Sequence, residues 1–201
     1  MSIVREAAKA VRITLILWVL TAIIYPLLIL LVGQIPFLQD KANGSIVRNF
    51  QDQPYGSALI GQQFRSERYF QGRPSTVRYS QGKDAKPTGL SGASNLAPSN
   101  PDLLSRVVDK ATRLKDENIE SVADLIYSSG SGLDPHISLR AAREQFERVA
   151  RARNIRPDEL VPLLNRYTEG RFLGIFGEPG VNILRLNYAL DLDEFNRQRN
   201  K

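Results

Sequence analysis

Residues 13–33 read ITLILWVLTAIIYPLLILLVG, and this apolar run decides the structural class of the 201-residue chain. The polar side chains among them belong to two threonines and one tyrosine, and the charge-free run continues to Gln39. At about 1.5 Å per residue, a helix of this length spans roughly 30 Å, the thickness of the hydrocarbon core of a bilayer. The pattern therefore predicts one transmembrane helix over residues 13–34.

Two other interpretations of this apolar run are a buried core helix and a cleaved signal peptide. A core helix is seldom apolar on every side over such a length. A signal peptide has an apolar region of about 7–15 residues and an A-x-A cleavage site, and no such site follows here. An uncleaved anchor fits best. We expect Tyr25, Pro26 and Gln34 to pack against partner helices, because a membrane helix tolerates proline where neighbours satisfy the freed carbonyl.

Flanking charge predicts the orientation of the anchor. Arg5, Lys9 and Arg12 precede the run, whereas Lys41 and Arg48 follow it. The positive-inside rule then places residues 1–12 in the cytoplasm and residues 35–201 outside it, in a single-pass protein.

The chain has no cysteine and one histidine, His136. This excludes a disulfide framework, a cysteine-ligated metal site, a thiol nucleophile and a site with several histidines. The sequence also lacks a phosphate-binding G-x-x-x-x-G-K-[ST] loop and a G-x-G-x-x-G motif. We therefore expect no metal, no catalytic residue and no cofactor held by this chain alone.

Residues 35–201 are long enough for one sizeable core. Removing Arg5, Lys9, Arg12 and Glu6 from the net charge of +6 leaves +4 on this part of the chain. Outside the cytoplasm, a basic domain fits an anionic lipid surface or an acidic partner face rather than nucleic acid, and the preferred interpretation is an ordinary solvated surface.

Apolar spacing and turn residues predict one α/β or α+β domain after the anchor. Asn43-Gly44 indicates a tight turn. Gln71–Pro101 indicates a long irregular loop rich in glycine and proline, with a disordered segment as the alternative. The predicted strands are Ser57–Phe64, Asp124–Ser128 and Val181–Leu190. One helix begins at Pro101 with Asn100 as its cap, and a short helix follows Pro157. The buried stripe of the first helix is expected to comprise Leu103, Leu104, Val107, Val108, Ala111 and Leu114.

A further helix is expected after Ser138, which would cap it. Its apolar side is formed by Ala142, Phe146, Val149 and Ala150. Its opposite side is expected to carry the i,i+4 pairs Arg140/Glu144, Arg143/Glu147, Glu144/Arg148 and Glu147/Arg151.

The run Ser128-Ser129-Gly130-Ser131-Gly132 is followed by Asp134 and His136, so it contains the residue types of a serine hydrolase. The G-x-S-x-G spacing of a nucleophile elbow is absent. The preferred interpretation is structural, with Gly130, Gly132, Asp134 and His136 forming a turn that leads into the helix capped by Ser138. A membrane-anchored hydrolase using Ser129 or Ser131 with His136 remains the alternative.

The segment Phe64–Lys86 interleaves basic and aromatic residues. They are Arg65, Arg68, Arg73, Arg78, Lys83 and Lys86, with Tyr69, Phe70 and Tyr79. Two interpretations are open, namely solvated arginines around buried aromatic rings, or a face that docks a partner.

Several ordered blocks resemble one known family. They are Tyr25-Pro26-Leu27-Leu28, Ala42-Asn43-Gly44-Ser45, Gly56–Gln62, Tyr69–Ser75, Ser91–Leu96, Ser129–Ser138, Arg148–Arg153 and Val181–Asp191. In this order they are similar to the C subunit of the bacterial Kdp-type high-affinity potassium-transporting P-type ATPase.

The resemblance implies an accessory, non-catalytic subunit in the bacterial cytoplasmic membrane. Its partners would be a potassium-translocating subunit and an ATP-hydrolysing subunit. The resemblance further implies a catalytic chaperone that raises the ATP affinity of the hydrolysing subunit, and a transient ternary complex with ATP is one route to this effect. Candidate residues for partner contact or for the nucleotide effect are Gln62, Tyr69, Arg73, Ser94 and Asn95. A stand-alone envelope-binding protein is a further alternative.

Overall fold

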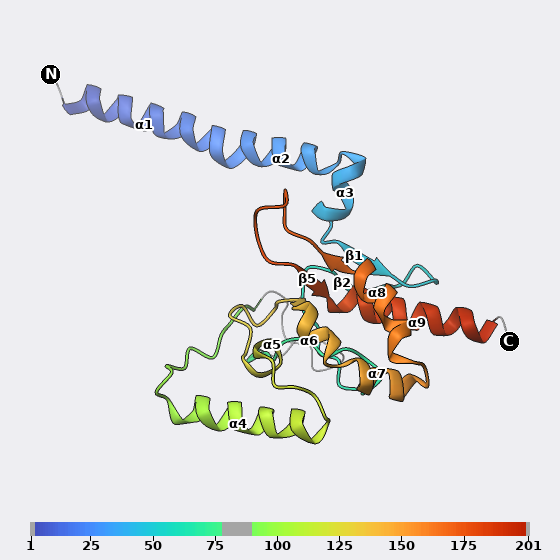
Figure 1. Ribbon diagram of the computed structural model, residues 1–201. Helices are drawn as coiled ribbons and strands as arrows, with labels where there is room; N and C mark the ends of the chain where they lie inside the picture. The colour runs from blue at the N-terminus through green and yellow to red at the C-terminus, as the bar shows by residue number, and fades with distance from the viewer. Residues whose placement is uncertain (1–2, 78–89, 200–201) are drawn as a thin grey trace. The chain divides into compact units, whose positions relative to one another are not determined.

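The computed structural model describes residues 3–77 and 90–199 (Figure 1). Its chain forms two compact units, Met1–Ile46 and Val47–Lys201. The first is helical and the second mixes helices with short strands, so the predicted combination of a long apolar helix with a mixed helix-and-sheet domain is confirmed.

The first unit contains one long helix and one short one. The long helix runs from Ile3 to Gly33 through α1 (Ile3–Val19), the turn η1 (Leu20–Ile24) and α2 (Tyr25–Gly33). It is apolar and long enough to cross a membrane, and none of its most apolar window is buried within the protein. The core-helix interpretation is therefore wrong. The helix α3 (Pro36–Ala42) follows, and Asn43 and Gly44 form the turn at its end, where Gly44 has a φ of +87°.

Pro26 is accommodated by a wide turn in the long helix. A proline inside a helix removes one backbone donor and crowds the carbonyl of the preceding turn. Here residues Leu20–Ile24 form a π-helical turn, and the Tyr25 N–H donates to the carbonyl of Leu20, five residues earlier. The extra residue in that turn gives the proline ring room.

The second unit begins with a two-stranded sheet of β1 (Ile46–Arg48) and β2 (Pro54–Ser57). The predicted strand Ser57–Phe64 is wrong, because β2 ends where that segment begins. Beyond it the chain bonds to a distant loop instead, with the Gly61 N–H donating to the Leu133 carbonyl at 2.7 Å. A Cβ on Gly61 would lie 2.6 Å from the Asp134 carbonyl oxygen, so this approach requires glycine.

A second, antiparallel sheet has the strand order β3-β5-β4. Its strands are β3 (His136–Ile137), β4 (Thr168–Glu169) and β5 (Gly180–Asn182). In register, His136 lies opposite Asn182, and Glu169 lies opposite Gly180.

The remaining elements of the second unit are helices. They are α4 (Pro101–Asp116), α5 (Ala123–Ile126), α6 (Leu139–Arg143), α7 (Phe146–Arg153), α8 (Leu160–Arg166) after the 3₁₀ turn Pro157–Glu159, and α9 (Ile183–Arg199). The predicted strand Asp124–Ser128 is wrong, since it begins inside α5. The predicted strand Val181–Leu190 is also wrong beyond Asn182, since α9 begins at Ile183. The buried residues of this segment fit helical spacing as well as strand spacing.

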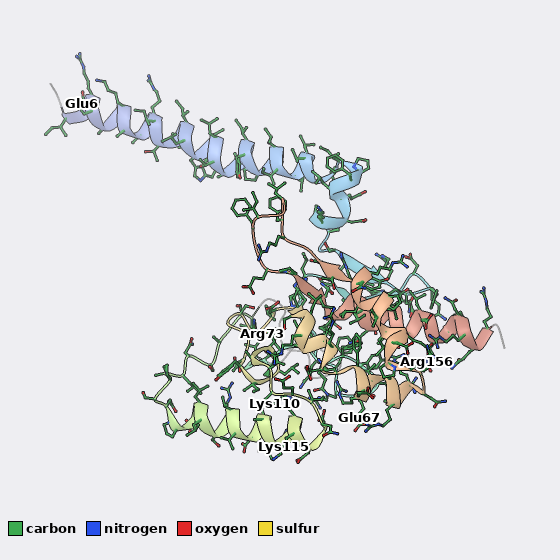
Figure 2. All side chains as sticks on the ribbon, viewed as in Figure 1. Glu6, Glu67, Arg73, Lys110, Lys115 and Arg156 are labelled. Carbon is green, nitrogen blue, oxygen red and sulfur yellow. The ribbon has the colours of Figure 1, made fainter. Side chains whose placement is uncertain are left out.

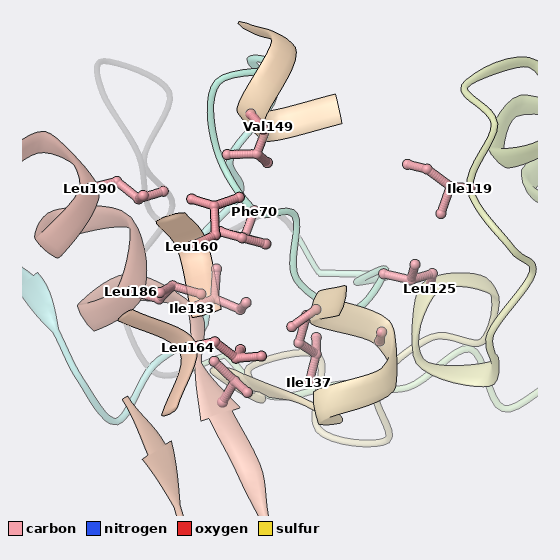
Figure 3. Close-up of a cluster of buried hydrophobic side chains, with 14 of the residues drawn as sticks. Phe70, Ile119, Leu125, Ile137, Val149, Leu160, Leu164, Ile183, Leu186 and Leu190 are labelled. Carbon is pink, nitrogen blue, oxygen red and sulfur yellow. The ribbon is translucent and has the colours of Figure 1, made fainter. Parts of the chain in front are cut away.

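The core lies between the three-stranded sheet and the helices α6 to α9 (Figure 3). Its fully buried members include Phe70, Val149, Leu160, Leu164 and Leu186. Phe70 comes from an irregular segment and reaches the core without a helix or strand of its own. That segment must therefore be held by other means.

The predicted cap of helix α4 is confirmed, whereas its predicted buried face is only partly buried. The Asn100 side chain accepts a hydrogen bond from the Asp102 N–H at 2.8 Å. Leu114 is buried, whereas Leu104 is 65% exposed and Val108 is 52% exposed, so the predicted stripe is wrong for these two. Figure 1 shows α4 at the edge of the second unit, where its last turns reach the core cluster.

The helix expected after Ser138 is divided by a turn at Glu144 and Gln145 into α6 and α7. The predicted burial of its alanines and Val149 is confirmed, but Arg148 is also buried. Its predicted i,i+4 pairs are wrong where the structure gives the partners. Arg140 pairs with Glu120 and Arg148 with Glu117. Because the turn interrupts the helix, the residues after it face the core in a different phase from that of one continuous helix.

Buried polar side chains hold the irregular segment that carries Phe70. The side-chain amide of Asn187 accepts from the Phe70 N–H and donates to the Phe70 carbonyl, both at 2.9 Å. Gln145 does the same for Gln71, at 2.8 and 3.0 Å. These two amides replace the hydrogen bonds that a neighbouring strand would supply. We call Asn187 and Gln145 the amide clamp.

Two arginines of α7 extend this support. Arg148 donates to the carbonyls of Glu67 and Tyr69, at 3.1 and 3.2 Å, and to the Gln145 side-chain oxygen at 2.6 Å. Arg153 donates to the Arg68 carbonyl at 2.6 Å. Helices α7 and α9 therefore fix the path of residues 67–71 through side chains.

Replacing Asn187 by alanine tests the clamp. We expect Asn187→Ala to lower the free energy of unfolding by about 2–4 kcal/mol, because it leaves a buried N–H and a buried carbonyl without partners. Asn196→Ala, on the exposed part of the same helix, should change it by no more than about 0.5 kcal/mol. Denaturant titration of the detergent-solubilised chain, followed by circular dichroism, measures both. Equal losses for the two variants would contradict the clamp.

Candidate functional site

A cavity of about 320 Å³ lies beside the segment that the amide clamp holds. Its lining combines cations, amides, hydroxyls and one aromatic ring. The lining residues that matter here are Gln62, Phe64, Gln71, Arg73, Ser75 and Lys110. Figure 2 marks Arg73 and Lys110 in the part of the domain next to α4, from which Lys110 comes. Of the residues singled out from the sequence, the cavity thus brings together Gln62 and Arg73.

Gln62 owes its position to a glycine. A Cβ on Gly56 would lie 2.0 Å from the Gln62 side-chain nitrogen. The amide of Gln62 can therefore lie over the backbone of β2 because no side chain stands there.

Arg73 is balanced by acidic neighbours on two elements. Its Nη1 lies 3.3 Å from an Asp134 carboxylate oxygen, and its Nε lies 3.8 Å from the carboxylate of Asp124. The Nε atom is buried and has no hydrogen-bond partner among the described residues.

The positive charge of Lys110 is not paired with an acidic side chain in the same way. It is half-buried, and none of the described residues forms a hydrogen bond or ion pair with its ammonium. Burial lowers its pKa, and the charge of Glu117 on the same helix opposes that shift. The cavity therefore holds an excess of positive charge next to amide and hydroxyl donors, which suits carboxylate or phosphate oxygens.

The loop Ser129–Gly132 joins the segments around this cavity. The Ser75 hydroxyl donates to the Gly132 carbonyl at 2.7 Å, and the Ser129 N–H donates to the Pro74 carbonyl at 2.9 Å. Gly132 has a φ of +71°, and a Cβ there would lie 2.6 Å from the Gly92 carbonyl oxygen. Gly130 is exposed, with nothing near its Cβ position.

An ion-pair chain runs from Arg73 to the three-stranded sheet. The Asp134 carboxylate accepts from the His136 N–H at 2.9 Å and lies 3.7 Å from His136 Nδ1. The His136 Nε2 lies 3.1 Å from the Glu169 carboxylate. The side-chain interaction of the His136 ring with the Asp134 carboxylate, followed by the charge of Glu169, raises the pKa of His136 despite partial burial, and the same side-chain interaction lowers the pKa of Asp134. Ser138, two residues on, caps α6 by accepting from the Ala141 N–H.

This arrangement provides no nucleophile–base pair for the hydrolase alternative within the described residues. Both ring nitrogens of His136 lie near carboxylates. The hydroxyls of Ser129 and Ser131 lie 3.2 Å from each other and accept from the backbone N–H groups of Gly132 and Leu133. A general base must reach the hydroxyl that it activates.

The other predicted contact residues lie away from the cavity lining. Tyr69 donates to the Asp191 carboxylate at 3.1 Å, and the Arg153 guanidinium lies 5.0 Å from the centre of its ring. Burial raises the pKa of Tyr69. Ser94 is half-buried, and Asn95 is exposed with a φ of +52°.

The structure bears on the first interpretation of the basic aromatic segment, solvated arginines around buried rings, and the docking of a partner stays a prediction. Phe70 is fully buried, and Arg68 forms an exposed ion pair with Glu194 at 2.6 Å. Arg73 faces the cavity instead. Arg78, Tyr79, Lys83 and Lys86 lie outside the described residues.

Lys110 and the amide clamp are the features of this region that the sequence reasoning missed. Lys110 follows Val107 and precedes Leu114 at helical spacing, so a cation within an apolar stripe was the available signal. Asn187 and Gln145 carried no comparable signal, because polar residues between apolar ones also fit an exposed face.

In residues 3–77 and 90–199 no group of three or more acidic or histidine side chains could hold a metal ion.

Comparison with known proteins identifies close relatives. Residues 7–192 match the family model described as "K+-transporting ATPase, c chain". A "Potassium-transporting ATPase KdpC subunit" from Anabaena sp. (strain L31) is 66% identical over 201 residues, the full length of both chains. Subunits of that name from Synechocystis sp. and Bacillus cereus are 60% and 42% identical, over 94% and 90% of this chain and 98% and 92% of theirs.

The His136 ion pairs predict a pH-dependent stability. Because the folded pKa is raised above about 6.5, the contribution is full below that pH and is lost as the pH rises through the folded value. His136→Gln should therefore lower stability at pH 6 by up to about 1 kcal/mol, since the ring is partly exposed. At pH 9 the variant and the natural protein should be nearly equal. Thermal unfolding at both pH values measures this, and a pH-independent difference would contradict it.

The excess charge in the cavity predicts stabilisation by anions. At ten times its Kd, phosphate should stabilise the domain by about 1.4 kcal/mol, or roughly 3–6 °C. Lys110→Met should abolish this effect, whereas Lys115→Met, an exposed lysine of the same helix, should keep it. Thermal unfolding in phosphate and in chloride at equal ionic strength provides the measurement. An equal stabilisation by phosphate in both variants would show that Lys110 does not bind the anion.

Proposed function

Because this chain belongs to the family of K+-transporting ATPase c chains, the KdpC subunits, we propose that it is a non-catalytic accessory subunit that stabilises an ATP-driven, high-affinity potassium uptake complex. The complex would contain a potassium-translocating subunit and an ATP-hydrolysing subunit. The observation that carries the proposal is a long apolar helix with no buried face, joined to a domain that offers no nucleophile–base pair within its described residues. Such a chain anchors and modulates partners.

The proposed location is the bacterial cytoplasmic membrane, with one crossing by residues 13–34. Residues 1–12 would lie inside, and residues 35–201 would form the outer domain. The excess of basic residues before the span supports this orientation. The π-helical turn before Pro26 supports a packing role for Tyr25, Pro26 and Gln34, since such turns interrupt regular helix surfaces where a partner can fit.

The domain would contact its partners through Gln62, Tyr69, Arg73, Ser94 and Asn95. In support, Gln62 and Arg73 line a cavity with unused donors, and Asn95 is exposed. The net charge of +4 beyond residue 34 also fits anionic lipid, and no feature of the domain requires nucleic acid.

The subunit is further proposed to act as a catalytic chaperone that raises the ATP affinity of the hydrolysing subunit. With the domain outside, cytosolic ATP cannot reach it, so the effect would pass through the partner helices as a coupling between sites. A transient ternary complex with ATP requires the domain to face the cytoplasm. In that case the cavity with Arg73 and Lys110 is where the phosphates would bind.

Affinity purification from potassium-starved cells tests this function. The tagged chain in mild detergent should recover stoichiometric amounts of a large ATPase and a multi-span potassium subunit, identified by mass spectrometry. His136→Ala should leave potassium-stimulated ATP hydrolysis of the purified complex largely intact.

Recovery of the chain alone, under conditions where the pump is expressed, would favour a stand-alone envelope-binding protein. An activity that is lost in His136→Ala while the fold is intact would instead favour the membrane-anchored hydrolase.

A further inference from the structure

The connection between β4 and β5 carries an apolar tip. Residues 170–180 read GRFLGIFGEPG, and we call Phe172–Phe176 the apolar tip. Phe172 is 71% exposed, Leu173 73%, Ile175 74% and Phe176 62%. Figure 1 shows this connection as a long excursion from the two strands, and added Cβ atoms at Gly170, Gly174 and Gly177 would meet nothing within 4 Å. Large side chains so exposed on a soluble surface mark a contact site.

The apolar tip has a defined backbone. Phe172 and Phe176 pair as an antiparallel bridge, with the Phe172 N–H donating to the Phe176 carbonyl at 2.8 Å and the reverse bond at 3.0 Å. Leu173 and Gly174 turn the chain with φ values of +54° and +75°. The Gly174 N–H donates to the Arg171 carbonyl at 3.1 Å. The turn therefore satisfies much of its own backbone and presents its side chains outward.

We propose that the apolar tip inserts into the lipid surface of the membrane in which the chain is anchored. The inference rests on the anchoring proposed above. Backbone groups that enter lipid must be satisfied within the protein, and those of Phe172 and Phe176 are. The run Phe172–Gly177 carries no charge, while Arg171 and Glu178 stand at its two ends, where headgroups would meet them.

The link to the anchor keeps the bilayer within reach. Residues 34–46 separate the long helix from the second unit, and fully extended they would span at most roughly 45 Å. The helix α3 takes up part of that link and shortens it. A domain tied this closely to a bilayer meets lipid continuously. A flexible apolar loop would fold back onto the domain, but the bridged turn holds these side chains out.

A cysteine-free chain allows a direct test. Leu173→Cys, labelled with an environment-sensitive fluorophore, is reconstituted as the full chain alone in phospholipid vesicles that contain lipids with nitroxide on the acyl chains. We expect several-fold stronger quenching at this position than in a matched Ser105→Cys variant, labelled on the exposed side of α4. Adding Phe172→Ser and Phe176→Ser to the Leu173→Cys chain should reduce the quenching to the Ser105→Cys level, with an unchanged circular dichroism spectrum.

Equal quenching at the two positions, with equal access to iodide in water, would overturn the lipid contact. Shielding of Leu173→Cys from iodide only after the other pump subunits are added would show a protein contact and also overturn it. Flotation of the vesicles reports the anchor separately. A chain that fails to float would refute the anchoring, and with it the insertion, whereas a floating chain with an unquenched tip would refute the insertion alone.

Discussion

The domain depends on two buried side-chain amides that form the backbone hydrogen bonds that a neighbouring strand would otherwise form. Asn187 and Gln145 each bind both backbone groups of one residue in an irregular segment, and Arg148 binds two carbonyls beside them. Buried backbone groups need partners, and no strand within residues 3–77 and 90–199 lies beside this segment to supply them. Because Asn187 belongs to α9 and Gln145 directly precedes α7, the positions of these helices and of Phe70 in the core determine one another.

The same clamp explains where the cavity lies. Fixing residues 67–71 places Arg73 near the carboxylates of Asp134, in a loop, and of Asp124, in α5, beside the cavity that Lys110 of α4 also lines. The loop Ser129–Gly132 then closes around the segment through backbone bonds that need glycine. The cavity and the fold thus share residues, so we expect changes near Arg73 to affect both anion binding and stability. Lys110 has no hydrogen-bond or ion-pair partner among the described residues, so we expect its replacement to affect anion binding alone.

The protein presents apolar side chains outward in two different ways. The long helix does so over residues 13–33, where its backbone bonds are internal, as a bilayer requires. The apolar tip does so over a few residues, held out by a bridged turn. On α4, Leu104 and Val108 are also exposed, in a helix whose sequence predicted a buried face. Burial in this domain follows from what neighbouring segments cover, which the sequence pattern of one helix does not contain.

The sequence by itself determined the long apolar helix, the caps at Asn100 and Ser138, and the family. These follow from local composition, from side chains that bond neighbouring backbone, and from ordered residue blocks. The tertiary structure decided that Val181–Leu190 is mainly helical, because its apolar residues fit both periods and the choice depends on the packing of Asn187 against Phe70. It also decided the cavity, since Gln62, Arg73 and Lys110 are distant in sequence and meet through contacts that no local pattern encodes.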